Sequence, residues 1–286
     1  MISLNTYSDV PYSPSVVLSL SDISPSLKNL HDLLFLPGFH SPTLALLYNP
    51  MHTWSGRYSS AKDTFCFEIR TFDLSSGGSY PLLTSVTGLP SDSLYLVACP
   101  AELGGVVVVT STGVIHIDQS GRVVGAGVNA WWEYASSLKA DKSSESRRLS
   151  LEGSKCVFVA ERDMLLVLQN GDVHQLRFEM EGRAVGTIKV DEQSSSVPPP
   201  SSVIIAGDRA LFVGSSDGNA LLARVDLMRK ASAVNGDSQP EMNSLEMEVD
   251  WDEGALKAMS TRLMITRFVW RYLRPGRQRE CESRGS

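Results

Sequence analysis

The chain has 286 residues, 42% of them hydrophobic and 20% charged, which is enough length and apolar content to bury a sizeable core. Its formal net charge of −6 argues against a dedicated nucleic-acid-binding protein, because such proteins usually carry a basic domain or stripe. The sequence has no apolar stretch of about 18 residues, and residues 1–19 lack the basic start and uninterrupted apolar core of a signal peptide. We therefore expect a soluble intracellular protein with no membrane partner.

Short apolar runs, separated by turn-forming residues, predict strands along most of the chain. Residues 64–73 largely alternate apolar and polar side chains, as a half-buried strand does. The predicted strands are residues 43–48, 64–73, 93–98, 106–110, 114–118, 156–160, 164–169, 173–178, 185–190, 203–206, 210–214 and 220–227.

Turn signals join several of these strands into hairpins. Asn170-Gly171 lies between two apolar runs, which is the strongest short hairpin signal. Residues 111–113 and 217–219 also place glycine at a chain reversal.

The strand spacing of roughly ten residues is typical of a β-sandwich, a barrel or a propeller. No long helical periodicity occurs before residue 230, and at about 40–50 residues per four-stranded blade, residues 40–230 would supply roughly four blades. We predict an all-β fold, a partial β-propeller of about four to five blades. No WD or kelch signature marks the blades, so the pattern alone also allows a sandwich.

Segments of different composition interrupt or follow the strands. Residues 136–150 are polar and serine-rich, which predicts an exposed loop, and the Pro/Ser segment at 191–202 cannot pair in a central strand. The predicted domains are a β-propeller fragment at residues 1–230, an acidic disordered linker at 231–253 and a basic tail at 254–286. The tail is interpreted as an artefactual or alternative end of the sequence, and the alternative is a short amphipathic helix.

No arrangement of residues predicts catalysis or a metal site. The four cysteines form no CxxC pair and no Cys/His cluster, which favours buried reduced thiols, and the five histidines show neither HxH nor HExxH spacing. His116 is expected on the solvent side of a strand, because its neighbours are isoleucines. We predict a protein that is not an enzyme and has no cofactor and no small-molecule substrate.

Three motif matches have simpler interpretations. Residues 214–218 fit GxSxG, but no histidine follows His174 to complete a triad in the expected order, so a hairpin turn is favoured. Residues 125–130 fit a loose dinucleotide-binding pattern, but no convincing helix follows, so a flexible turn is favoured. The acidic cluster at 246–253 is more typical of a solvated patch than of a cation site.

Trp54 and Arg57 are the candidate partner-contact residues. They lie in the segment Thr53-Trp54-Ser55-Gly56-Arg57, and an exposed Trp beside an Arg is typical of protein-interface hot spots. The alternative is a loop whose Trp54 closes the neighbouring sheets.

A second aromatic group could stack on nucleic-acid bases, as single-strand binders do. It comprises Trp131, Trp132 and Tyr134. Core or blade-edge packing is favoured, because no basic run accompanies them before Arg147-Arg148. The segment that starts there, residues 147–150, resembles a basophilic kinase site.

Several segments, taken in order, resemble the largest subunit of the cleavage and polyadenylation specificity factor. They are residues 35–48 (FLPGFHSPTLALLY), 53–57 (TWSGR), 62–64 (KDT), 104–109 (GGVVVV) and 211–222 (LFVGSSDGNALL). The resemblance covers about residues 3–228, and related scaffolds of damaged-DNA binding and splicing share parts of it. The TWSGR and KDT segments favour the polyadenylation branch.

This resemblance implies a nuclear, non-catalytic scaffold that holds the subunits recognising the polyadenylation signal. The implied partners are the other subunits of the cleavage and polyadenylation complex, with RNA reached mainly through them. Direct RNA binding, or an adaptor role in a ubiquitin ligase or in splicing, are the alternatives. Residues 2–12 resemble the interior of a propeller and the family pattern stops after Glu253, so we expect an unclosed fragment that is aggregation-prone or needs its missing strands in trans.

Overall fold

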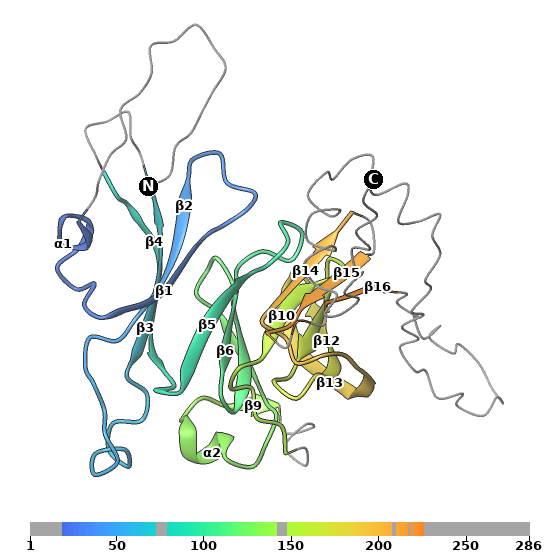
Figure 1. The fold of residues 1–286 in the computed structure, drawn as a ribbon. Helices are drawn as coiled ribbons and strands as arrows, with labels where there is room; N and C mark the ends of the chain where they lie inside the picture. Colours follow the sequence, from blue (N-terminus) through green and yellow to red (C-terminus); the bar gives the residue numbers. More distant parts are fainter. Residues whose placement is uncertain are drawn as a thin grey trace, which may run out of the picture. The chain divides into compact units, whose positions relative to one another are not determined.

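The computed structural model describes residues 19–72, 79–141, 148–207, 210–216, 218 and 220–225 (Figure 1). The chain divides into two compact units. Among the described residues, unit 1 contains those up to Thr110, Val114–Val123 and Trp131–Lys139. Unit 2 contains Ser111–Gly113, Val124–Ala130 and the described residues from Ala140 onward.

The described strands form four sheets. In spatial order, the first contains β1 (Leu30–Phe35), β2 (Thr43–Tyr48), β3 (Phe65–Thr71) and β4 (Leu82–Leu89). The second contains β5 (Ser93–Ala98), β6 (Val106–Thr110), β7 (Gly113–Ile117), β8 (Val123–Gly127) and β9 (Ala140–Asp141). The third contains β10 (Lys155–Phe158), β11 (Asp163–Val167), β12 (Asp172–Glu181) and β13 (Ala184–Ser196), and the fourth β14 (Ser202–Ala206), β15 (Ala210–Gly214) and β16 (Leu221–Arg224).

In every sheet the spatial order of the strands equals their order in the chain. Meanders of about four strands are the blades from which propellers are built, and here the last pair of the second sheet, β8 and β9, is parallel. Within the described residues, the helices are α1 (Leu20–Ile23) and α2 (Trp132–Ala135), each of a single turn. The predicted all-β fold, a partial β-propeller, is confirmed. No helix in these residues is long and apolar enough to cross a membrane.

The core of unit 1 is built on strands that are buried on both faces. Every residue of β2 is buried: Leu44 and Leu46 pack with Leu27 and Phe72 on one face, and Leu47 is buried on the other. Because no face of such a strand meets water, its sequence is a continuous apolar run rather than an alternation.

The core of unit 2 joins the third and fourth sheets. Leu165 and Val167 of β11 pack with Val173 of β12, and Leu211 and Val213 of β15 belong to the same cluster. These residues are leucines and valines, which suit the pleated surface of a buried strand.

The hairpin predicted at Asn170-Gly171 is confirmed, since β11 pairs with β12 in antiparallel register. Gly171 has a φ of 92°, a left-handed conformation that glycine adopts without steric cost. The Asn170 amide donates to Asp172 Oδ2 at 2.7 Å, and the Asp172 N–H donates to Asn170 Oδ1 at 3.0 Å. The conformation of Gly171 and the hydrogen bonds between Asn170 and Asp172 therefore both stabilise this turn.

Two predictions about local structure are wrong. His116 is not on a solvent face: it is 1% exposed, because both faces of β7 are covered. Residues 125–127 are not a flexible turn but belong to β8, where Gly125 pairs with Ala140 and Ala126 with Asp141. Ladder pairing and the burial of Ala126 outweigh the low strand propensity of glycine there.

The two segments predicted as irregular are more ordered than expected in their described parts. Residues 136–150 begin at the buried Ser136 and include β9. Within residues 191–202, β13 continues to Ser196, at the edge of its sheet, and the prolines follow its end. An edge position agrees with the expected exclusion from a central strand. Residues 1–18 and 231–286 lie outside the described part, so the domain boundaries stay a prediction.

Candidate protein-binding surface

Trp54 lies on the long loop between β2 and β3 and is 61% exposed. The Arg57 N–H donates to the Trp54 carbonyl at 2.8 Å and closes a turn, which brings the Arg57 guanidinium over the indole, with Cζ 5.5 Å from the ring centroid. This is the geometry of a cation–π contact. The exposure of Trp54 contradicts the alternative in which the indole closes the neighbouring sheets.

The backbone around Arg57 is fixed by further bonds. Its carbonyl accepts from the N–H groups of Ser60 and Ala61, both at 3.0 Å, and from the Ser60 hydroxyl at 3.0 Å. The stacking on Trp54 is the side-chain interaction that the guanidinium makes among the described residues. Its charge is therefore held in place without a carboxylate partner there.

The end of the same loop is attached to α2. The Lys62 ammonium donates to the carbonyls of Glu133 at 3.0 Å and Ser136 at 2.9 Å, in and directly after α2. Asp63 accepts from the Ser136 hydroxyl at 2.9 Å and from the Ser137 N–H at 3.0 Å. The two charged side chains thus fasten the loop and the helix together.

Helix α2 separates its aromatic residues between two faces. Trp132 is buried, and its indole N–H donates to the Leu138 carbonyl at 3.1 Å. Trp131 and Tyr134 are each 68% exposed, with ring centroids 5.6 Å apart and planes at 53°. The expected core or blade-edge packing is confirmed for Trp132, whereas Trp131 and Tyr134 do not lie in the core, because residues three apart share one side of a helical turn.

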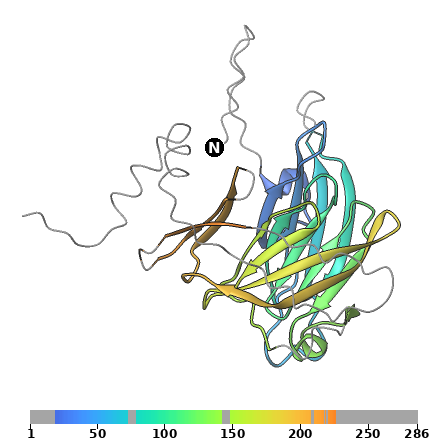
Figure 2. The same cartoon turned by 90° about the vertical axis from the view of Figure 1, so that its right-hand side faces the viewer.

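We call Trp54, Arg57, Trp131 and Tyr134 the aromatic surface. Figures 1 and 2 show the loop between β2 and β3 and helix α2 at the same end of unit 1, as the bonds of Lys62 and Asp63 require. Exposed Trp, Tyr and Arg are the side chains that contribute most to protein interfaces, because they bury large areas and make directional contacts.

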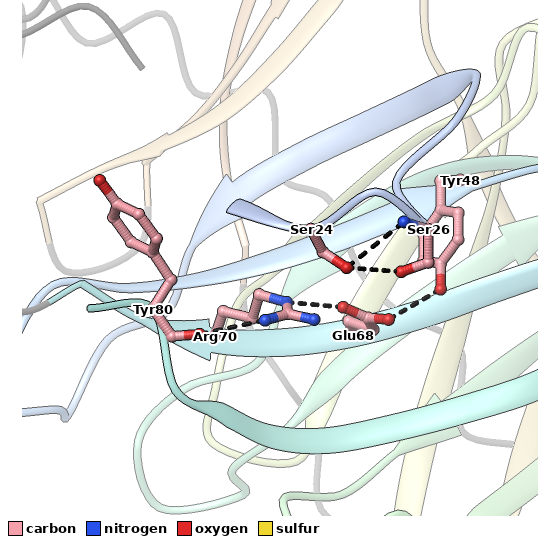
Figure 3. A network of polar contacts seen from close by, with 6 residues as sticks. All are labelled: Ser24, Ser26, Tyr48, Glu68, Arg70 and Tyr80. Atoms are coloured by element: carbon pink, nitrogen blue, oxygen red, sulfur yellow. Dashed lines mark hydrogen bonds and ion pairs between the residues drawn. The ribbon is translucent and has the colours of Figure 1, made fainter. Parts of the chain in front are cut away.

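A polar network elsewhere in unit 1 is structural (Figure 3). Glu68 of β3, only 4% exposed, accepts from the Tyr48 hydroxyl at 2.8 Å and from Arg70 Nε at 2.7 Å, and Arg70 Nη1 donates to the Tyr80 carbonyl at 3.0 Å. Burial and the neighbouring Glu68 carboxylate raise the pKa of Tyr48 far above its usual value. The carboxylate is satisfied on both oxygens, so it acts as a buried anchor rather than as a proton acceptor.

Three of the five histidines are hydrogen-bonded to backbone carbonyls within the fold. His31 bonds the Leu94 carbonyl at 2.9 Å, His116 the Gly104 carbonyl at 3.0 Å, and His174 the Asp191 carbonyl at 3.3 Å. Burial lowers the pKa of His116. Within the described residues, no group of three or more His, Cys, Asp or Glu could hold a metal ion.

The described cysteines, Cys66, Cys99 and Cys156, carry free thiols. Cys99 is buried as expected, whereas Cys66 and Cys156 are half-buried. Burial raises the pKa of the Cys66 and Cys99 thiols, which disfavours the reactive thiolate. The GxSxG match forms a turn between β15 and β16, with the Gly218 N–H donating to the Ser215 carbonyl at 3.3 Å.

Comparison with known proteins gives one family match and a consistent set of relatives. The model of the RSE1/DDB1/CPSF1 first β-propeller matches residues 30–250. The chain is 34% identical over 219 residues to Protein cft1 of Aspergillus niger and 28% identical over 228 residues to Protein cft1 of Schizosaccharomyces pombe. These alignments cover 74% and 76% of this chain but only 16% of each relative, so the chain spans about a sixth of their length.

Proposed function

We propose, because this chain belongs to the RSE1/DDB1/CPSF1 first β-propeller family, that it is a non-catalytic scaffold in the cleavage and polyadenylation of messenger RNA precursors. It holds the subunits that recognise the polyadenylation signal and works in the nucleus. The match of the family model to residues 30–250 carries the proposal. The relatives named cft1 support the polyadenylation branch, as does the TWSGR segment at residues 53–57.

The described side chains support a binding role rather than a catalytic one. Three histidines and the buried Glu68 are bonded within the fold, whereas the aromatic surface exposes Trp54, Trp131 and Tyr134. A scaffold needs such exposed anchors, since binding free energy in protein complexes is concentrated in a few large side chains.

Direct RNA binding is the second candidate function, because exposed aromatic rings can stack on bases. The net charge of −6 weakens it, since phosphate contacts need several cations and make affinity fall steeply with salt. We therefore assign RNA contact mainly to the partners of this chain.

Affinity purification of the tagged 286-residue chain from nuclear extract, followed by mass spectrometry, tests the proposal. Recovery of cleavage and polyadenylation subunits is the expected result. Recovery of ubiquitin-ligase or splicing subunits instead would move the chain to a related branch of the family. Treatment of the extract with ribonuclease leaves the expected set unchanged if the contacts are between proteins.

A further inference from the structure

We propose that the aromatic surface binds a short apolar peptide segment of a partner that carries one carboxylate, and that Arg57 receives this carboxylate. The inference rests on the proposed scaffold function and adds the chemistry of the partner. It follows from three properties of the surface. Arg57 is a cation without an ion-pair partner among the described residues, the aromatic rings are exposed, and the charge of the neighbouring Lys62 is opposed by that of Asp63.

The cation is Arg57. Its guanidinium is stacked on the Trp54 ring and pairs with no carboxylate among the described residues. A stacked guanidinium keeps its N–H edge available, and this edge matches a carboxylate through two parallel hydrogen bonds. The stacking and the turn at residues 54–57 restrict the side chain before binding, which lowers the entropy lost on association.

The apolar part of the site is aromatic. The rings of Trp131 and Tyr134 meet at 53° with centroids 5.6 Å apart, and both side chains are largely exposed. A tilted pair of this kind offers faces to aliphatic or proline side chains, as in the aromatic grooves that bind extended peptides. The Trp54 indole N–H and the Tyr134 hydroxyl add donors, which suit the carbonyl groups of an extended chain.

The remaining charges argue for one carboxylate rather than a run of phosphates. The Lys62 ammonium is bonded to the carbonyls of Glu133 and Ser136, and the adjacent Asp63 carboxylate opposes its charge. Glu133 is itself exposed on α2. Arg57 is the cation that belongs to the aromatic surface, and it forms no ion pair with a described residue, whereas nucleic-acid grooves carry several cations.

Selection from a phage library of random dodecapeptides on the immobilised full chain tests this inference. The enriched peptides are expected to carry Asp or Glu beside apolar or proline residues. Synthetic copies should bind Arg57→Gln and Trp54→Ala at least about tenfold more weakly, because each change removes a charge-assisted bond or its aromatic support. Arg183→Gln, which alters an exposed arginine between β12 and β13, is the matched control and should leave affinity unchanged.

Enriched peptides that lack Asp and Glu, or equal binding to the Arg57→Gln chain, would overturn the inference. Binding of a labelled twelve-nucleotide oligouridine with steep salt dependence, in place of any peptide, would also overturn it. The selection uses purified protein alone. Its failure therefore leaves the scaffold proposal to be judged by co-purification from nuclear extract, and the two results are independent.

Discussion

The carboxylate of Asp63 accepts a hydrogen bond from the hydroxyl of Ser136 at 2.9 Å, across 73 residues of chain. The neighbouring Lys62 holds the Ser136 carbonyl from the same loop, at 2.9 Å. These two bonds bring the β2–β3 loop, which carries Trp54, to the helix that carries Trp131 and Tyr134. The exposed aromatic residues are thus held by charged side chains that are themselves part of the fold.

Replacing Asp63 by Ala should lower the free energy of unfolding by about 1–3 kcal/mol, because the hydroxyl of the buried Ser136 and the N–H of the exposed Ser137 lose their acceptor. Urea unfolding measures the loss, and faster hydrogen exchange at the Ser137 amide localises it. Asp22→Ala on α1, an exposed aspartate, should change stability by less than about 0.5 kcal/mol. An unchanged exchange rate at Ser137 in the Asp63→Ala chain would contradict this role.

For the buried network of β3, we expect a single substitution to cost more stability than a double substitution. Arg70→Met should cost about 3–5 kcal/mol, because it leaves the Glu68 carboxylate buried with its charge unpaired. The double change Glu68→Leu and Arg70→Met should cost clearly less than Arg70→Met alone, because an apolar pair leaves no buried charge. Urea unfolding of the two variants measures this difference. A double variant no more stable than the single one would show that the unpaired Glu68 charge does not cause the loss of stability.

Gly171→Ala should destabilise the β11–β12 hairpin by more than about 2 kcal/mol. The residue has a φ of 92°, and a Cβ there would lie 1.9 Å from the Val197 carbonyl oxygen, so the β13 end must shift. Gly182→Ala is the matched control, since its φ is 68° but nothing lies within 4 Å of its Cβ position. It should cost about 1 kcal/mol, from backbone strain alone. Thermal or urea unfolding of both variants checks the difference, and equal losses would refute the steric account.

The stability of the chain should fall as the pH is lowered from 7.5 to 5.5. Burial lowers the pKa of His116 in the folded protein, so below the unfolded value of about 6.5 the unfolded chain binds more protons than the native one. One such group contributes a slope of at most about 1.4 kcal/mol per pH unit. Urea unfolding across this range measures the slope, and His116→Gln should reduce it. If His116→Gln has the same slope of unfolding free energy against pH, the pH dependence arises from other titratable groups.

Local patterns in the sequence predict most of the fold. Asn170-Gly171 marks its hairpin because the turn chemistry lies in the two residues themselves, and the run at residues 106–110 reads as a strand because its residues are β-branched. The exposed position of Trp54 beside Arg57 follows from their place in a polar loop. Their contact with a partner stays a prediction.

Properties that depend on neighbouring segments could not be predicted in the same way. The neighbours of His116 in sequence are compatible with a solvent-facing strand, and its burial comes from the coverage of both faces of β7. Trp131 and Trp132 are adjacent and alike in sequence, yet one is exposed and the other buried. Their different exposure results from the helical turn at α2, which directs the two side chains to different sides. The three-residue spacing of Trp131 and Tyr134 was the one sequence signal that these two residues share a side.

The aromatic surface is proposed to hold the partner subunits. The most direct test of this proposal compares nuclear-extract purifications of the tagged chain with a Trp54→Ala, Arg57→Gln double variant, using Phe35→Ala, an exposed aromatic on β1, as the control. All three chains should unfold at similar urea concentrations, because the altered side chains are exposed or half-buried. The double variant should lose at least about 90% of the co-purified cleavage and polyadenylation subunits, while the control keeps them. Equal recovery with all three chains would contradict it.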